Sequence, residues 1–304
     1  MRTYDQATLL RYLSVMNNGE IDFFLGSGAS AQAGIPTGGT MVWDFKRALY
    51  CSENSVSKEL FKDLNTDVTQ KTLQAYFDAQ DGHPTLWAPD EYAHYFEICY
   101  PTAIARERYI QSKVKDISPS IGHLCLGELF IKGRIVNVWT TNFDELVEAG
   151  IKTLAPGHSF NVYSSANRRV APCNTLSSVV KLHGDYRYDY IKNTPTELQQ
   201  LEASMQKVFS ESLGDKGLVV IGYSGSDESI MSILETGMMN PNFLKYGLIW
   251  AMPEGAVMSD RLHNLLEKAC GKSENSGLVQ IQGFDDFMHS VYAVQGCKNN
   301  LIAG

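Results

Sequence analysis

The chain has few cysteines, and none of them is arranged as a metal site. The six cysteines among its 304 residues are scattered and include no Cys-x-x-Cys pair, whereas structural zinc sites take their ligands from closely spaced pairs. We therefore expect reduced thiols, no disulfide framework and no bound zinc or other metal. The cysteines are Cys51, Cys99, Cys125, Cys173, Cys270 and Cys297.

Long apolar runs and clustered positive charge are also missing. No uncharged apolar stretch is long enough to cross a bilayer, and the first residues, Met-Arg-Thr-Tyr-Asp-Gln, lack the apolar core of a signal peptide. The net charge is −8, and basic residues cluster only in short pairs such as Arg168-Arg169. Both facts argue against a surface that neutralises nucleic-acid backbones. With 44% hydrophobic residues, the composition predicts a globular cytoplasmic protein without membrane binding or direct sequence-specific nucleic-acid binding.

A glycine-rich turn after an apolar strand is the most informative segment that is present. From position 23 to 37 the chain reads Phe-Phe-Leu-Gly-Ser-Gly-Ala-Ser-Ala-Gln-Ala-Gly-Ile-Pro-Thr. Gly26 and Gly28 allow a sharp turn and a close approach of the backbone to a ligand. A helix that starts near Ala29 would aim free N–H groups at a pyrophosphate. Such turns also occur where a strand only packs tightly on a helix, so the motif alone leaves both interpretations open.

The rest of the chain alternates strands with helices after a helical stretch. Apolar residues recur at helical spacing from about 44 to 132, which predicts an all-helical insertion. Short β-rich runs follow, separated mostly by helical patterns. The whole chain, 1–304, is therefore predicted as one α/β domain with a Rossmann-like, doubly wound parallel sheet. The predicted strands are 21–25, 135–139, 160–163, 179–182, 218–221, 248–251 and 278–281, with a closing helix over 285–293.

Four of these strands run into a polar or glycine-bearing turn at the end where a Rossmann-type fold binds ligands. Each turn has a simple structural alternative: Asn142, Asp144 or Asp227 caps a helix, and His183-Gly184 is an ordinary turn. The presence of all four turns at one edge of the sheet favours a binding site over four separate structural roles. The turns read Gly26-Ser27-Gly28-Ala29-Ser30, Thr140-Thr141-Asn142-Phe143-Asp144, Leu182-His183-Gly184 and Gly222-Tyr223-Ser224-Gly225-Ser226-Asp227.

In this order the motifs resemble those of the sirtuin (silent information regulator) family of NAD-consuming proteins, over nearly the whole chain. The chain looks more like the bacterial sirtuin-like NADase effectors of antiphage defence than like protein deacylases. Deacylases carry a four-Cys zinc module between the His-Gly and the final Gly-x-Ser motif, and no cysteine lies between His183 and Gly222. The deacylase Gly-Ile-Pro-Asp-Phe-Arg is here Gly34-Ile35-Pro36-Thr37-Gly38-Gly39.

The resemblance implies a role for each matching residue. Asn142 and His183 would be catalytic, the amide ordering the attacking water and ribose, and the imidazole accepting a proton. Asp144 would lie near the nicotinamide carboxamide, and Gly222, Ser224 and Asp227 near the adenosine half. The full set of implied NAD-binding residues is Gly26, Ser27, Gly28, Ala29, Ser30, Gly34, Ile35, Pro36, Thr37, Thr141, Phe143, Asp144, Gly222, Tyr223, Ser224 and Asp227.

The resemblance implies an NAD⁺ hydrolase that releases nicotinamide and ADP-ribose and depletes NAD in abortive infection. Two alternatives stay open: a deacylase or ADP-ribosyltransferase that uses the same substrate, and a non-catalytic subunit that senses NAD or ADP-ribose. Because unrestrained NAD loss is toxic, we expect control by homo-oligomerisation or by a separate partner such as a DNA-translocating ATPase or helicase or a short Argonaute. The helical insertion would cover the NAD site or form oligomer contacts.

Overall fold

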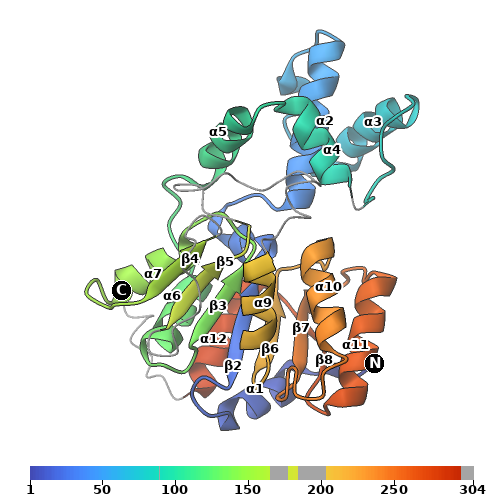
Figure 1. Cartoon of the computed structure of the whole chain (residues 1–304). Coiled ribbons are helices and arrows are strands. Elements are labelled where there is room, and N and C mark those ends of the chain that lie inside the picture. Colours follow the sequence, from blue (N-terminus) through green and yellow to red (C-terminus); the bar gives the residue numbers. More distant parts are fainter. Residues whose placement is uncertain (89, 165–176, 184–202, 296–304) are drawn as a thin grey trace.

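The computed structural model describes residues 1–88, 90–164, 177–183 and 203–295. Its centre is one eight-stranded sheet in the order β1-β8-β7-β6-β2-β3-β5-β4, and every neighbouring pair is parallel (Figure 1). The strands are β1 (Thr3–Tyr4), β2 (Ile21–Leu25), β3 (Asn137–Thr140), β4 (Asn161–Ser164), β5 (Ser178–Lys181), β6 (Gly217–Ile221), β7 (Leu248–Pro253) and β8 (Gly277–Ile281).

The strand order confirms the predicted doubly wound fold. From β2 the chain passes to β3 on one side and later returns to β6 on the other side, so the direction of winding reverses at β2. In parallel α/β sheets, ligands bind beside the carboxyl ends of strands at such a reversal. The edge strand β1 was not predicted, because two residues paired with Leu278 and Val279 leave no periodic pattern in the sequence.

Helices cover both faces of the sheet. One face is covered by α1 (Gln6–Val15), α6 (Ile121–Ile131), α7 (Leu146–Leu154) and α12 (Phe284–Val294), whose apolar residues share one core cluster. The other face is covered by α9 (Ala203–Ser212), α10 (Glu228–Gly237) and α11 (Asp260–Lys272). None of the described helices is long and apolar enough to cross a membrane.

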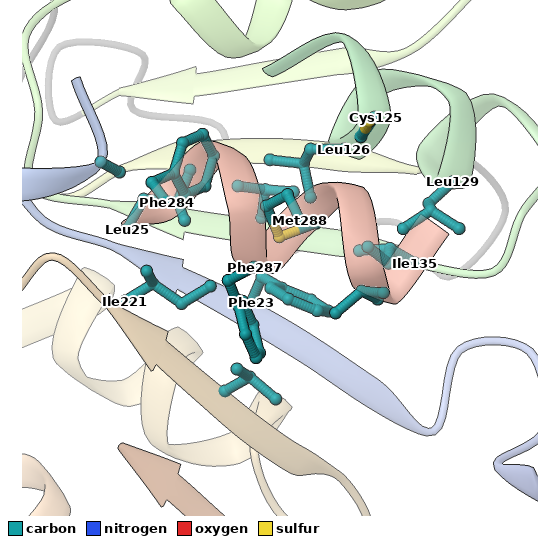
Figure 2. Packing of buried hydrophobic residues seen from close by; sticks show 14 of the residues in the cluster. Phe23, Leu25, Cys125, Leu126, Leu129, Ile135, Ile221, Phe284, Phe287 and Met288 are labelled. Atoms are coloured by element: carbon teal, nitrogen blue, oxygen red, sulfur yellow. The ribbon is translucent and has the colours of Figure 1, made fainter. Parts of the chain in front are cut away.

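The alternation of side chains along β2 supplies both cores. Phe23 packs into the cluster with α12, and Phe24 packs into the opposite cluster with Trp139, as expected where successive strand residues face opposite sides of a sheet. Figure 2 shows Phe287 and Met288 of α12 lying between Phe23 and the α6 side chains. Burial on both faces explains why β2 reads as an apolar run.

A group of helices between β2 and β3 stands at one end of the sheet (Figure 1). It begins with η1 (Ser27–Ala33) and continues through α2 (Gly38–Glu53), η2 (Lys58–Phe61), α3 (Asp67–Asp78), α4 (Glu91–Cys99) and α5 (Ala103–Val114). Helices α2, α3, α4 and α5 share a third apolar cluster, built around Phe45, Phe96 and Tyr109. Trp87, in contrast, is 64% exposed. Helix α6 instead packs on the sheet, against α7 and α12.

Candidate active site

The turns after β2 and β6 lie against each other at the reversal of strand order. The amide of Gly28 donates to the carbonyl of Gly222 over 2.8 Å, and that of Gly26 donates to the carbonyl of Ile221 over 2.9 Å. A Cβ on Gly28 would lie 2.8 Å from Gly222 Cα, and one on Gly222, whose φ is +69°, would lie 2.3 Å from the amide nitrogen of Ala29. These glycines therefore let two turns pack backbone to backbone.

This packing changes two expectations about the glycine-rich turn. The helix that follows is the 3₁₀ segment η1, starting at Ser27, and not an α-helix from Ala29. The amides of Gly28 and Ala29 were expected to face a pyrophosphate freely, but they already donate to Gly222 and Gly26. The sequence could not reveal this, because the partner turn lies almost two hundred residues away along the chain. Ser27 remains exposed at the start of η1.

Asn142 is held by both hydrogens of its side-chain amide. Nδ2 donates to the carbonyl of Gly26 and to Oγ of Ser30, each over 3.0 Å, while the backbone amide donates to Thr140 Oγ1 over 2.9 Å. The residue is 9% exposed. Among the described residues no hydrogen bond uses its Oδ1. The amide is thus oriented with its acceptor oxygen available, two residues beyond the end of β3.

Ser30 and Asp144 complete this buried network. Oγ of Ser30 accepts from Asn142 and donates to Asp144 Oδ2 over 2.7 Å, and Asp144 Oδ1 accepts from the amide of Leu146 over 3.0 Å. Ser30 is 1% exposed, so its hydroxyl fixes other side chains and does not face solvent. The predicted residues Gly26, Ser30, Asn142 and Asp144 are therefore brought together from two segments, the turns that follow β2 and β3.

A buried ion pair supports the loop between β3 and α7. Lys181 Nζ, at the end of β5, donates to the backbone carbonyl of Asp144 over 2.7 Å and pairs with Glu148 Oε1 at 2.9 Å. Burial raises the pKa of Glu148 despite the opposing charge of Lys181. Neither residue was predicted to belong to the site. A lysine inside the apolar run Val179–Leu182 does indicate a buried ion pair, because lysine is rarely fully buried unless it is paired.

His183 follows β5 and contacts an acid from a different part of the sheet. Its Nε2 lies 2.5 Å from Oδ2 of Asp227, whose Oδ1 accepts from the backbone amides of Ser229 and Ile230 at the start of α10. Burial opposes ionisation of Asp227, but these interactions outweigh it and lower the pKa of that carboxyl. The ring centroids of Phe143 and His183 are 6.5 Å apart, so His183 lies near the loop that carries Asn142.

Several predicted residues lie around this centre without joining it. Gly34 ends η1 in the left-handed region at φ 98°, and Thr37 caps α2 by accepting from the amide of Thr40. Ile35 packs into the apolar cluster of the insertion, and the adjoining Pro36 is half-buried.

The remaining predicted residues belong to the turns after β3, β5 and β6. Thr141 donates its amide to Leu25, and Ser224 is exposed and bonds to Ser226. The ring of Tyr223 packs on Phe24 and Trp250. The predicted Gly184, like Cys173, Cys297 and the pair Arg168-Arg169, lies outside the described residues.

The described part of the chain contains no group of three or more His, Cys, Asp or Glu side chains that could hold a metal ion. The cysteines within it, Cys51, Cys99, Cys125 and Cys270, are free thiols.

Two solved structures are similar to this chain over nearly its full length. One, titled "Structural Basis for the Mechanism and Regulation of Sir2 Enzymes", is 12% identical, and the match covers 96% of this chain and 96% of that chain with a TM-score of 0.45. The other, titled "Crystal structure of a Sir2 homolog-NAD complex", is 14% identical, and the match covers 95% of this chain and 94% of that chain with a TM-score of 0.44. No curated protein matches the chain.

The match to a protein family covers the part of the chain that holds most of the site. Residues 136–271 match the family model of the SIR2-like domain, and this range includes Asn142, Asp144, His183 and Asp227. This segment is therefore similar to the SIR2-like domain, in agreement with the sirtuin-like character that the motifs predicted.

Proposed function

We propose that the chain is an NAD⁺ hydrolase that cleaves the bond between nicotinamide and ribose. The observation that carries this proposal is the orientation of Asn142, whose two amide hydrogens are both engaged while Oδ1 is left as an acceptor. An oriented acceptor at the same sheet edge as a histidine suits the activation of a water molecule. The SIR2-like domain supports NAD as the substrate that this site takes.

In the proposed reaction, water attacks the anomeric carbon of the nicotinamide ribose as the carbon–nitrogen bond breaks. The bonding electron pair leaves with nicotinamide, which becomes neutral, and the water loses one proton to His183. Asn142 Oδ1 accepts a hydrogen bond from that water and holds its lone pair toward the carbon. The products are nicotinamide, ADP-ribose and a proton. Asp144 contributes by fixing Ser30, which in turn holds Asn142.

The remaining predicted contacts are part of the same proposal. The exposed Ser27 and the half-buried Gly28 lie on the rim of the β2 turn, where a diphosphate would approach. Ser224 is exposed beyond β6 and is assigned to the adenosine half. Asp144 is also retained as the candidate partner of the carboxamide.

The test is incubation of the purified chain with NAD, followed by chromatography for nicotinamide and ADP-ribose. We expect Asn142→Ala and His183→Ala each to lower turnover by about a hundredfold or more, with His263→Ala, on the exposed side of α11, as the unaffected control. Near-normal nicotinamide release by both site variants would overturn the assignment. Nicotinamide release that requires an acylated peptide, or ADP-ribose found on protein, would replace it with a transferase, and NAD binding without turnover would replace it with a sensor.

We also propose that the hydrolase is an antiphage effector whose activity depends on assembly. Support comes from the resemblance to defence NADases and from apolar side chains exposed on the insertion, such as Leu60, Val68 and Ile104. Light scattering should find a homo-oligomer with low basal turnover that rises when a partner ATPase or short Argonaute is added. A monomer that hydrolyses NAD at full rate, with no response to such a partner, would contradict this dependence.

A further inference from the structure

The contact between His183 and Asp227 crosses the centre of the sheet. His183 follows β5 and Asp227 follows β6, and the strand order puts β2 and β3 between these two strands. The 2.5 Å contact therefore spans the turns that carry Gly26 and Asn142. Neither His183 Nε2 nor Asp227 Oδ2 makes a hydrogen bond to any group in the described part of the chain, so the close contact between them is the polar interaction that each atom makes there. The contact between the two side chains is therefore made by these two atoms.

Asp227 is held rigidly on its other oxygen. Oδ1 accepts from the amide of Ser229 at 2.8 Å, from its hydroxyl at 2.7 Å, and from the amide of Ile230 at 3.3 Å. These bonds fix the carboxylate at the first turn of α10, where the helix dipole also favours a negative charge. The side chain is only 7% exposed. The other oxygen of this fixed, buried carboxylate lies 2.5 Å from Nε2 of the imidazole.

A carboxylate accepts hydrogen bonds and cannot donate them, so the imidazole nitrogen that faces it carries the proton. We propose that Asp227 is a positioning residue, which holds His183 as the Nε2–H tautomer and leaves Nδ1 as its proton-accepting atom. This inference rests on the proposed hydrolase and adds the atom through which His183 acts. It also reassigns Asp227, which sequence resemblance connected with the adenosine half of NAD.

The first experiment reads the tautomer directly and needs no activity. In the full chain labelled with ¹⁵N-histidine, the His183 signals are identified by their loss in His183→Gln, and the imidazole is observed at a pH where it is neutral. We expect Nε2 protonated and Nδ1 unprotonated. Asp227→Asn, whose amide can donate to Nε2, should shift the population toward the Nδ1–H form. An unchanged tautomer in this variant would overturn the proposal.

The second experiment separates positioning from substrate contact. Asp227→Asn keeps a good N-cap for α10, so its melting temperature should match that of the control Ser229→Ala, which removes one bond to Oδ1 but keeps the carboxylate. We expect Asp227→Asn to lower kcat by about tenfold to a hundredfold with little change in KM. A raised KM with an unchanged kcat would mean that Asp227 contacts the substrate instead.

The results of these experiments distinguish failure of the positioning role from failure of the proposed hydrolase function. If the wild-type chain releases no nicotinamide from NAD under any condition, the hydrolase assignment is lost, whereas the tautomer measurement still decides how Asp227 acts on His183. If the chain hydrolyses NAD and Asp227→Asn changes neither the tautomer nor kcat, the hydrolase stands and the positioning role is rejected.

Discussion

Lys181 links the two strand ends of the candidate site, because its completely buried Nζ donates to the backbone carbonyl of Asp144 over 2.7 Å. The strand that carries Lys181 leads directly to His183, and the loop that it holds carries Asn142. The relative position of the two proposed catalytic side chains therefore depends on the bond from this amine to the loop backbone.

The first prediction concerns this lysine. Lys181→Met leaves the carboxylate of Glu148 buried without its charge partner, and we expect a loss of about 3–5 kcal/mol in the free energy of unfolding. The double variant Lys181→Met with Glu148→Leu should recover much of that stability, since an apolar pair replaces the ion pair. It should not recover NAD turnover, because the Asp144 carbonyl still lacks its donor. Denaturant unfolding and turnover of both variants test this, and full recovery of turnover would contradict it.

The second prediction concerns Ser30. Ser30→Ala removes the hydroxyl that joins Asn142 to Asp144, and leaves a buried donor and a buried acceptor unpaired. We expect a loss of about 2–4 kcal/mol in unfolding free energy and a fall in turnover of about tenfold or more, because the Asn142 amide can rotate. Ser27→Ala, at an exposed position of the same turn, is the control for stability. Equal stability of the two variants would argue against the network.

The third prediction concerns the packed turns. In Gly222→Ala the new Cβ would lie 2.3 Å from the amide nitrogen of Ala29, on a backbone in the left-handed region. We therefore expect a loss of about 3 kcal/mol or more in the free energy of unfolding, and increased protease sensitivity. Gly271→Ala in α11 has no atom within 4 Å of the new Cβ. That control should be neutral or more stable by up to about 1 kcal/mol. Equal melting temperatures of the two variants would disprove the backbone-to-backbone packing.

The fourth prediction is a pH dependence caused by Asp22. This carboxyl is buried between Asn137 and Trp139, which donate to its Oδ2, and burial raises its pKa to about 6 from the usual 3.8. The folded state therefore holds the proton more tightly, and Asp22 lowers stability increasingly as pH rises from about 4 to about 6.

Asp22→Asn removes this titration. Relative to wild type, the variant should gain about 3 kcal/mol in unfolding free energy between pH 4 and pH 7.5, which corresponds to the difference between the two pKa values. Urea unfolding of both proteins at several pH values measures the difference. Parallel pH profiles would show that the carboxyl is ionised as easily in the folded as in the unfolded chain.

The fifth prediction is that chelators leave the protein unchanged. The sequence provides no cysteine between His183 and Gly222 for a zinc module, and a structural zinc site would contribute directly to folding energy. EDTA should therefore not shift the melting temperature, and elemental analysis should find no stoichiometric zinc. A chelator-induced drop that added zinc reverses would reopen the deacylase alternative.

The sheet was predictable because buried parallel strands leave short apolar runs, and all predicted runs coincide with strands to within about two residues. The turns at their carboxyl ends were predictable from glycines and polar residues that interrupt those runs. Sequence could not reveal which side chains meet across the turns. Ser30, Asp144 and Asp227 were expected to face a ligand. In the structure Ser30 bonds to Asn142 and Asp144, and Asp227 contacts His183, so each contact joins residues far apart in the chain.

The third apolar cluster determines how the insertion could be exchanged. Phe45 and Phe96 of the insertion share it with Ile35, which follows the glycine-rich turn, and with Leu146, which follows the Asn142 loop. The helices therefore have no core that closes without the strand-end loops, and those loops lose their apolar cover without the helices. The insertion cannot be transplanted as an independent unit, because a chimaera that receives it must also receive Ile35 and Leu146.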